Sequence, residues 1–152
     1  MMEQNSVMQT WLPYPDFQES AHALDLATLG IQREHVLAVL DVLHDSSTSI
    51  FHGAPDRLVN MWRGHEPQLC EYGLVIAEEY QRRMATDNKI LNDLDWHLDC
   101  ATSGEFSMDK PKWFGDIDFH NAHKSALLRT NPAFYRDKFD VSRTLEMIWP
   151  EA

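Results

Sequence analysis

The chain has 152 residues, of which 43% are hydrophobic and 24% are charged, as in one globular domain with a full core. No apolar stretch approaches about 18 residues, and the N-terminus lacks the basic and apolar regions of a signal peptide, so we expect neither a membrane span nor export. Cys70 and Cys100 lack zinc-finger spacing, which predicts reduced thiols in a cytoplasmic protein. We expect no metal and no cofactor.

The formal net charge is −11, and it is unevenly spread. Residues 1–106 carry 6 basic and 17 acidic residues, whereas residues 107–143 carry 7 basic and 5 acidic residues. Proteins that bind duplex DNA usually show a strong basic surface, because neutralising phosphates supplies most of their affinity. We therefore expect any contact with nucleic acid to centre on residues 107–143, or the ligand to be smaller than DNA.

The chain is predicted to be a flexible tail over residues 1–8 and a single α-helical domain over residues 9–152. Two prolines predict that residues 10–15 form an extended segment. Asp16, with Glu19 three residues later, resembles a capping box that begins a helix, and Gly30 is predicted to end that helix.

The remaining segments also have helical spacing. Residues 32–43 form a helix with a wide apolar face, followed by a polar loop over residues 44–49. Further helices are expected over about residues 56–63, 67–84, 87–98, 116–128 and 131–139. No segment alternates as a strand would. The prediction is an all-α, single compact domain of six or seven helices.

Four segments are distinctive in combination: MQTWLPYPDF at residues 8–17, LGIQR at 29–33, MWRG at 61–64, and FHNAHKSALLR at 119–129. In this order they resemble small bacterial and phage proteins related to the pyrimidine-dimer DNA glycosylase/AP-lyase of the phage endonuclease V type. The resemblance covers about residues 8–150. It implies an endonuclease V-like all-α fold and action at the base–sugar linkage of DNA.

The resemblance also implies a mechanism. In the family, a free N-terminal amine attacks the sugar C1′, forms an imine, and the strand then breaks by elimination; an amine with a pKa near 8 keeps a neutral fraction at pH 7. Here seven residues precede Met8, where the family-like segment begins. Gly30 stands where the family has its glutamate, with Asp25 and Glu34 as the nearest substitutes. Thr10 replaces an arginine.

Two histidines, His120 and His123, are three residues apart on an expected helix, so both can face one site beside Lys124 and Ser125. One interpretation is acid–base chemistry and phosphate contact, because histidine titrates near neutrality. The other is one histidine bonded to a backbone carbonyl and one exposed. A metal pair would need a third ligand, and none is identified.

Arg33 is interpreted either as a clamp for phosphate or carboxylate or as a partner in a salt bridge. Trp62 and Trp113 are either base-stacking groups or core residues. The predicted catalytic residues are Gln9, Thr10, Glu34, His120 and His123. The predicted substrate-binding residues are Gln32, Arg33, Trp62, Trp113, Lys124 and Ser125. We expect Gln9, Thr10, Gln32, Arg33, His120 and His123 to converge on one pocket.

The function these features predict is that of a DNA glycosylase/AP-lyase-like protein, leaning toward an enzyme. Its partner is a damaged or modified nucleotide in DNA or a free nucleotide, and whether its chemistry has diverged stays open. The alternative is a non-catalytic protein that sequesters a nucleotide-like ligand in the same pocket. A third hypothesis is an acidic DNA mimic or protein-interaction module.

Overall fold

The computed structural model describes residues 8–51, 53–84, 89–103 and 109–151, and within these ranges it contains seven helices and no strand. The helices are α1 (Phe17–Ala23), α2 (Leu26–His44), α3 (Asp56–Trp62), α4 (Glu66–Met84), α5 (Lys89–Ser103), α6 (Ile117–Thr130) and α7 (Pro132–Tyr135). The all-α prediction is confirmed. The predicted tail lies, apart from Met8, outside the described residues. In the described part of the chain, no helix is long and apolar enough to cross a membrane.

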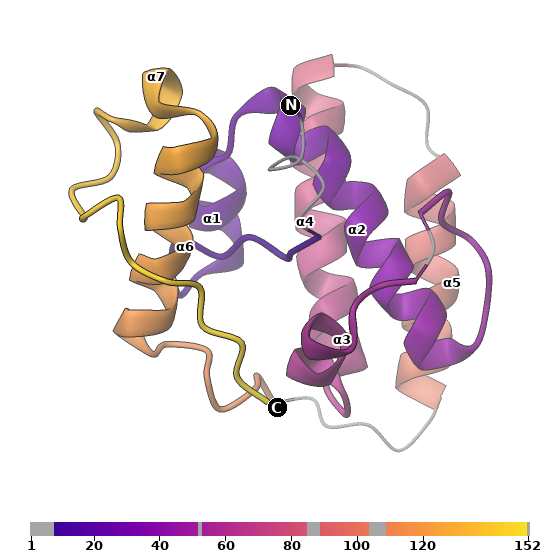
Figure 1. Cartoon of the computed structure of the whole chain (residues 1–152). Coiled ribbons are helices and arrows are strands. Elements are labelled where there is room, and N and C mark those ends of the chain that lie inside the picture. The colour runs from indigo at the N-terminus through magenta and orange to yellow at the C-terminus, as the bar shows by residue number, and fades with distance from the viewer. Residues whose placement is uncertain (1–7, 52, 85–88, 104–108, 152) are drawn as a thin grey trace.

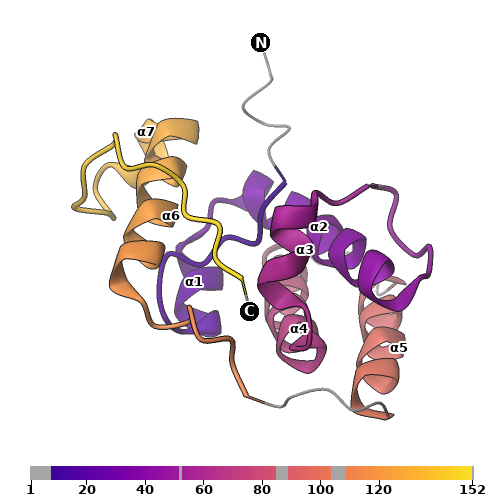
Figure 2. The same ribbon diagram turned by 60° about the horizontal axis from the view of Figure 1, so that its bottom comes forward.

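The helices form two groups, visible in Figures 1 and 2. In the first, α2 packs on α3, α4 and α5, and α4 also packs on α5. In the second, α6 packs on α7 beside α1, which contacts α4. The extended segment that precedes α1 runs between α6 and the α2–α3 side (Figure 2). We call its buried part, residues 9–13, the arm.

The prediction that Gly30 ends the first helix is wrong. The helix α1 ends at Ala23, Asp25 is the N-cap of α2, and α2 runs through Gly30. At Gly30 the helix passes close to the side chain of Tyr80, whose Cε1 would lie 3.1 Å from an added Cβ. The expected cap by Asp16 is confirmed, since its side chain accepts a hydrogen bond from Glu19 N.

A second glycine brings three helices together. A Cβ at Gly73 of α4 would lie 2.8 Å from both Leu94 Cδ2 of α5 and Val36 Cγ1 of α2. Real Cβ atoms do not approach other atoms so closely, so the core in the first group depends on the missing side chain at this position.

The second group is closed by caps and by the C-terminal segment. Asn131 caps α7 and Pro132 occupies its first turn, as predicted, although α7 ends at Tyr135 rather than near residue 139. The predicted cap of α5 at residues 87–88 lies outside the described residues. Arg129 Nη1 donates to the carbonyls of Arg143 and Leu145, which holds the C-terminal segment against α6.

Candidate functional site

The arm is an extended segment whose backbone is hydrogen-bonded to side chains of surrounding helices rather than to other backbone groups. Gln9, Thr10, Trp11 and Leu12 are all buried. Buried backbone groups must find partners, and an isolated extended segment has none of its own. The helices around the arm supply these partners, so its position is fixed by the fold.

On one side of the arm, the side chains of Gln32 of α2 and Tyr72 of α4 hydrogen-bond its backbone. Gln32 Nε2 donates to the carbonyl of Gln9, and its Oε1 accepts from Trp11 N at 2.9 Å. The hydroxyl of Tyr72 lies 2.6 Å from Trp11 O and 2.7 Å from Gln32 Oε1. Burial raises the pKa of Tyr72 well above its ordinary value, so the hydroxyl keeps its proton and acts as a donor.

On the other side, two histidines of α6 hold a single residue, Leu12. His123 Nδ1 accepts from Leu12 N at 2.9 Å, and His120 Nδ1 lies 2.7 Å from Leu12 O. His120 Nε2 accepts from Gly115 N at 2.9 Å, so its proton is on Nδ1 and is donated to the Leu12 carbonyl. The two imidazoles therefore hold opposite tautomers.

Both rings are neutral at neutral pH. Burial lowers the pKa of His123 to about 3, helped by the neighbouring His120, and burial likewise lowers the pKa of His120. Both side chains have no exposed surface. This geometry assigns the pair to positioning of the arm. Their catalytic role stays a prediction.

Trp62 and Trp113 lie in the core beside the arm. Trp62 Nε1 donates to Thr10 Oγ1 at 3.0 Å, and Trp113 Nε1 donates to Met61 O at 2.9 Å. Their rings meet edge to face, with centroids 5.0 Å apart, and both are buried. Stacking on a base stays a prediction, and it would require either ring to leave the core.

The beginning of the arm adjoins His35, a residue that the sequence interpretation missed. Met8 is partly buried, and the ring of His35 hydrogen-bonds the backbone of Gln9. Burial lowers the pKa of His35, so the ring is neutral. Two atoms here are buried without a hydrogen-bond partner, Gln9 Nε2 and His35 Nδ1. Such atoms cost about 1–3 kcal/mol each when they stay unpaired.

The signal that could have identified His35 was its spacing. It follows Gln32 by three residues, so the two lie on the same side of α2. A histidine in a helix with many apolar residues requires a polar partner, and the arm supplies one.

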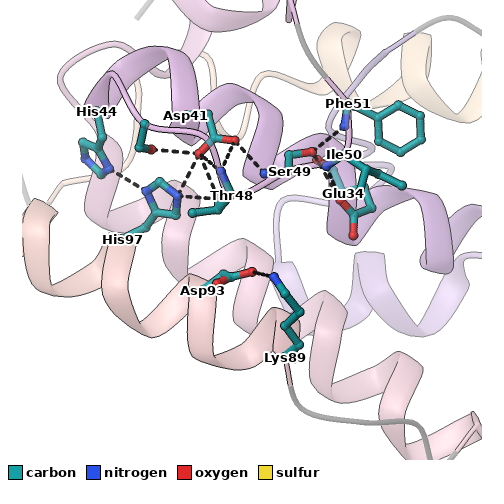
Figure 3. Close-up of polar contacts among 11 residues, drawn as sticks. Glu34, Asp41, His44, Thr48, Ser49, Ile50, Phe51, Lys89, Asp93 and His97 are labelled. Carbon is teal, nitrogen blue, oxygen red and sulfur yellow. Dashed lines mark hydrogen bonds and ion pairs between the residues drawn. The ribbon is translucent and has the colours of Figure 1, made fainter.

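Arg33 and Glu34 point elsewhere. The guanidinium of Arg33 lies 4.0 Å from the ring centroid of Tyr80, and its Nε donates to Gly30 O. Glu34 Oε1 accepts from Ser49 Oγ at 3.2 Å and from Ile50 N at 3.3 Å, which fastens the loop after α2 (Figure 3). Successive residues on a helix project about 100° apart, so neither joins Gln32 at the arm.

The two remaining substrate-binding candidates lie on α6. Ser125 is buried and accepts from Arg129 Nη1 at 3.0 Å and Leu145 N at 3.1 Å, so it anchors the C-terminal segment. Lys124 Nζ lies 4.5 Å from the ring centroid of Tyr14, just beyond the arm. Lys124 is half-buried.

Of the six residues expected to converge on one pocket, five lie around the arm and Arg33 does not; the five are Gln9, Thr10, Gln32, His120 and His123. They meet as a buried hydrogen-bonded network. Two described cavities lie elsewhere. One, of about 420 Å³, is lined by Tyr14, Glu19, His22, Ala23 and Lys138, and the other, of about 170 Å³, is lined by Pro15, Asp16, Phe17, Gln18, Glu71, Val75 and Lys110. No predicted site residue lines either cavity.

A separate polar cluster fixes the loop after α2 (Figure 3). Asp41 accepts from Thr48 N at 2.9 Å and Ser49 N at 2.7 Å, and its Oδ1 lies 3.3 Å from His97 Nε2. Burial alone would raise the pKa of Asp41, but these hydrogen bonds lower it. His97 Nδ1 and His44 Nδ1 lie 2.8 Å apart. In the described residues no group of side chains is suited to a metal ion.

Among the described residues, the lysines and arginines that make ion pairs lie on α4 and α5. Arg82 and Arg83 pair with Glu79, and Lys89 pairs with Asp93. In the described part of residues 107–143, no lysine or arginine makes an ion pair. The basic residues of this segment are Lys110, Lys112, Lys124, Arg129, Arg136, Lys138 and Arg143. Residues 107–143, which we call the basic segment, therefore carry lysines and arginines that have no carboxylate partner.

A compact helical domain organised around a buried N-terminal arm defines the class of this protein. The family model for pyrimidine dimer DNA glycosylase matches residues 8–93, from the residue before the arm to the first part of α5. The chain therefore belongs to the pyrimidine dimer DNA glycosylase family. Neither curated proteins nor solved structures include a significant match.

Proposed function

We propose that the domain recognises a damaged or modified nucleotide in DNA, and that any chemistry at the base–sugar linkage takes place where the arm begins, at Met8. The observation that carries the proposal is the clamped arm. Side chains of α2, α3, α4 and α6 bond residues 9–12, so the position of Met8 relative to the domain is fixed. Reactions that depend on a positioned nucleophile need such rigidity.

The proposed partner is DNA, contacted through the basic segment. Lysines that make no ion pair stand over aromatic rings near the end of the arm: Lys124 over Tyr14, and Lys110 at 5.5 Å from the ring centroid of Phe17. Ammonium groups without carboxylate partners are available to phosphates, which supply most of the affinity for DNA.

The proposed lyase chemistry uses an α-amine. In a form of the protein that begins at Met8, the amine lies one residue before the clamped arm. The neutral ring of His35 contacts the backbone of Gln9, the next residue. In the chain with residues 1–7, the amine is seven residues away, up to about 24 Å of extended chain. Its return to the site costs loop-closure entropy.

Borohydride trapping on DNA with an abasic site tests this proposal. The form that begins at Met8 should become covalently linked to the DNA more efficiently than the full chain. Equal trapping of both forms would show that the N-terminal amine is not the nucleophile. Glu34→Gln and His120→Gln should be assayed in parallel, because they report whether those predicted groups contribute to the chemistry.

A second candidate function is non-catalytic binding of a nucleotide-like ligand. It is favoured by the complete burial of His120 and His123, because neither can exchange a proton with a substrate while it holds Leu12. The absence of trapping by either form would select this function. Because the Arg33 guanidinium lies over the Tyr80 ring, away from the arm, Arg33→Ala then tests whether the predicted clamp takes part in ligand binding.

A further inference from the structure

We propose that His44 and His97 form an acid-sensitive latch between the end of α2 and the middle of α5, closed at neutral pH and opened when both rings bind a proton. His44 is the last residue of α2 and is half-buried, whereas His97 has no exposed surface. Their Nδ1 atoms face each other 2.8 Å apart (Figure 3). The pair takes no part in holding the arm, so the inference is independent of the proposed function.

The neighbours of His97 assign one proton position to each ring. The hydroxyl of Thr48 donates to Asp41 Oδ1 at 2.8 Å, so its oxygen can accept. His97 Nε2 lies 3.0 Å from that oxygen and 3.3 Å from Asp41 Oδ1, both of them acceptors, so the proton of neutral His97 is on Nε2. Its Nδ1 therefore accepts, and Nδ1 of His44 carries the proton of the bond between the rings.

The space between the two Nδ1 atoms holds one proton. A single added proton is tolerated on His44, because the negative end of the α2 dipole favours a positive ring there and the bond to His97 becomes charge-assisted. With both rings protonated, each Nδ1 carries a hydrogen, and two donors would face each other at 2.8 Å. Two positive rings with centroids 5.0 Å apart also repel each other. The second proton therefore forces the rings apart.

Of the two rings, His44 is the one that leaves. His97 stays enclosed in the core beside the carboxylate of Asp41, which stabilises its positive charge. His44 is half-buried at a helix end, so a change of rotamer takes it into solvent. The turn beside it is closed by Asp45, in the left-handed conformation with φ 53°, and by Ser46 N, which donates to Asp41 O at 2.9 Å. Release of His44 unties this last turn from α5, so the turn opens more often.

The surroundings set the pH at which the latch opens. Burial lowers the pKa of both His44 and His97 below the unperturbed value of 6.5, and His44 lowers that of His97 further. Asp41 of α2 raises the pKa of both rings, and Asp93 of α5, which is paired with Lys89, raises that of His97. Because the separated rings bind protons more readily than the closed pair, the latch is fully closed above pH 6.5 and loosens as the pH falls.

Nuclear magnetic resonance titration of the full chain from about pH 8 to about pH 4 tests the latch, because this range spans the titration of histidine. The nuclear Overhauser contact between the rings of His44 and His97 should disappear as the second ring titrates. The protection factor of the Ser46 amide, which corrects for the intrinsic pH dependence of exchange, should fall about tenfold, the effect of one lost hydrogen bond. A contact that persists when both rings are charged, or rings that stay neutral until the domain unfolds, would overturn the proposal.

Two variants of His44 separate the latch from acid effects elsewhere in the fold. In His44→Asn the amide can donate to His97 Nδ1 but cannot bind a proton, so the protection of Ser46 should stay high at acid pH. His44→Phe keeps a ring but has no donor, so the protection should be low at every pH. The control His65→Asn changes a histidine just before α4, whose Nδ1 lies 2.7 Å from Asp109 O, and it should retain the wild-type pH dependence. A wild-type pH dependence in His44→Asn would reject the latch.

Discussion

The ring of His123 accepts a hydrogen bond from the backbone N–H of Leu12, a residue 111 positions earlier in the chain. This contact joins α6 to the arm and leaves His123 no exposed surface. His123→Leu should destabilise the domain by about 1–3 kcal/mol, because the N–H of Leu12 would lose its partner in the core. Urea denaturation measures the change. The neighbouring Lys124→Gln should have little effect on stability, and an equal loss in both variants would contradict the assigned role.

The same histidine predicts a pH dependence of stability. Its pKa is about 3 in the folded protein and 6.5 when unperturbed, so between these values the unfolded chain binds a proton that the folded protein does not. Stability is therefore full above pH 6.5 and falls as the pH decreases, by about 1.4 kcal/mol per pH unit for one group. Denaturation between pH 7 and pH 4 measures this slope. His123→Gln, which cannot titrate, should reduce it by about one proton.

The approach of three helices at Gly73 predicts that Gly73→Ala destabilises the core. The new methyl group would press on Val36 and Leu94, at a cost of about 1–3 kcal/mol. Gly30→Ala is the matched control, because its methyl group meets only the partly exposed ring of Tyr80 and alanine is the better helix former. Thermal unfolding should rank Gly73→Ala clearly below Gly30→Ala; the reverse order would reject the packing argument.

The loop after α2 should depend on the carboxylate of Asp41. In Asp41→Asn, the uncharged amide retains one acceptor oxygen and loses the charge-assisted bonds to Thr48 and Ser49. We expect faster hydrogen exchange at these two amides and a loss of about 1–3 kcal/mol. Asp45→Asn, on the exposed neighbouring turn, serves as control. Exchange rates at Thr48 and Ser49 that stay unchanged in Asp41→Asn would refute the anchoring role.

The charge distribution predicts weak and salt-dependent binding to undamaged duplex DNA. The net charge of −11 repels a polyanion at long range, and the basic segment offsets this only nearby, since the Debye length is about 10 Å at 0.1 M salt. Fluorescence anisotropy at several salt concentrations measures the slope of log K against log salt. Lys110→Gln and Lys124→Gln should each reduce it by about one. Tight binding at physiological salt would contradict this expectation.

The helical spacing of apolar residues and the helix caps in the sequence were sufficient to predict the all-α fold class. Asp16 and Asn131 act as caps where the pattern placed them. The boundary at Gly30 was wrong because a glycine that ends a helix and one that permits close packing look alike in a sequence. Only Tyr80, fifty residues later, distinguishes the two cases.

For the site, the sequence motifs grouped Gln9, Thr10, Gln32, His120 and His123, which do meet at the arm, together with Arg33, which does not. Their orientation was decided by the tertiary structure alone. An extended arm has unpaired backbone groups, and burying it between α6 and α2 requires nearby polar side chains to satisfy them. That demand turns both histidines inward toward Leu12 and leaves Gln9 and His35 each with one unpaired atom, and no local pattern in the sequence encodes this outcome.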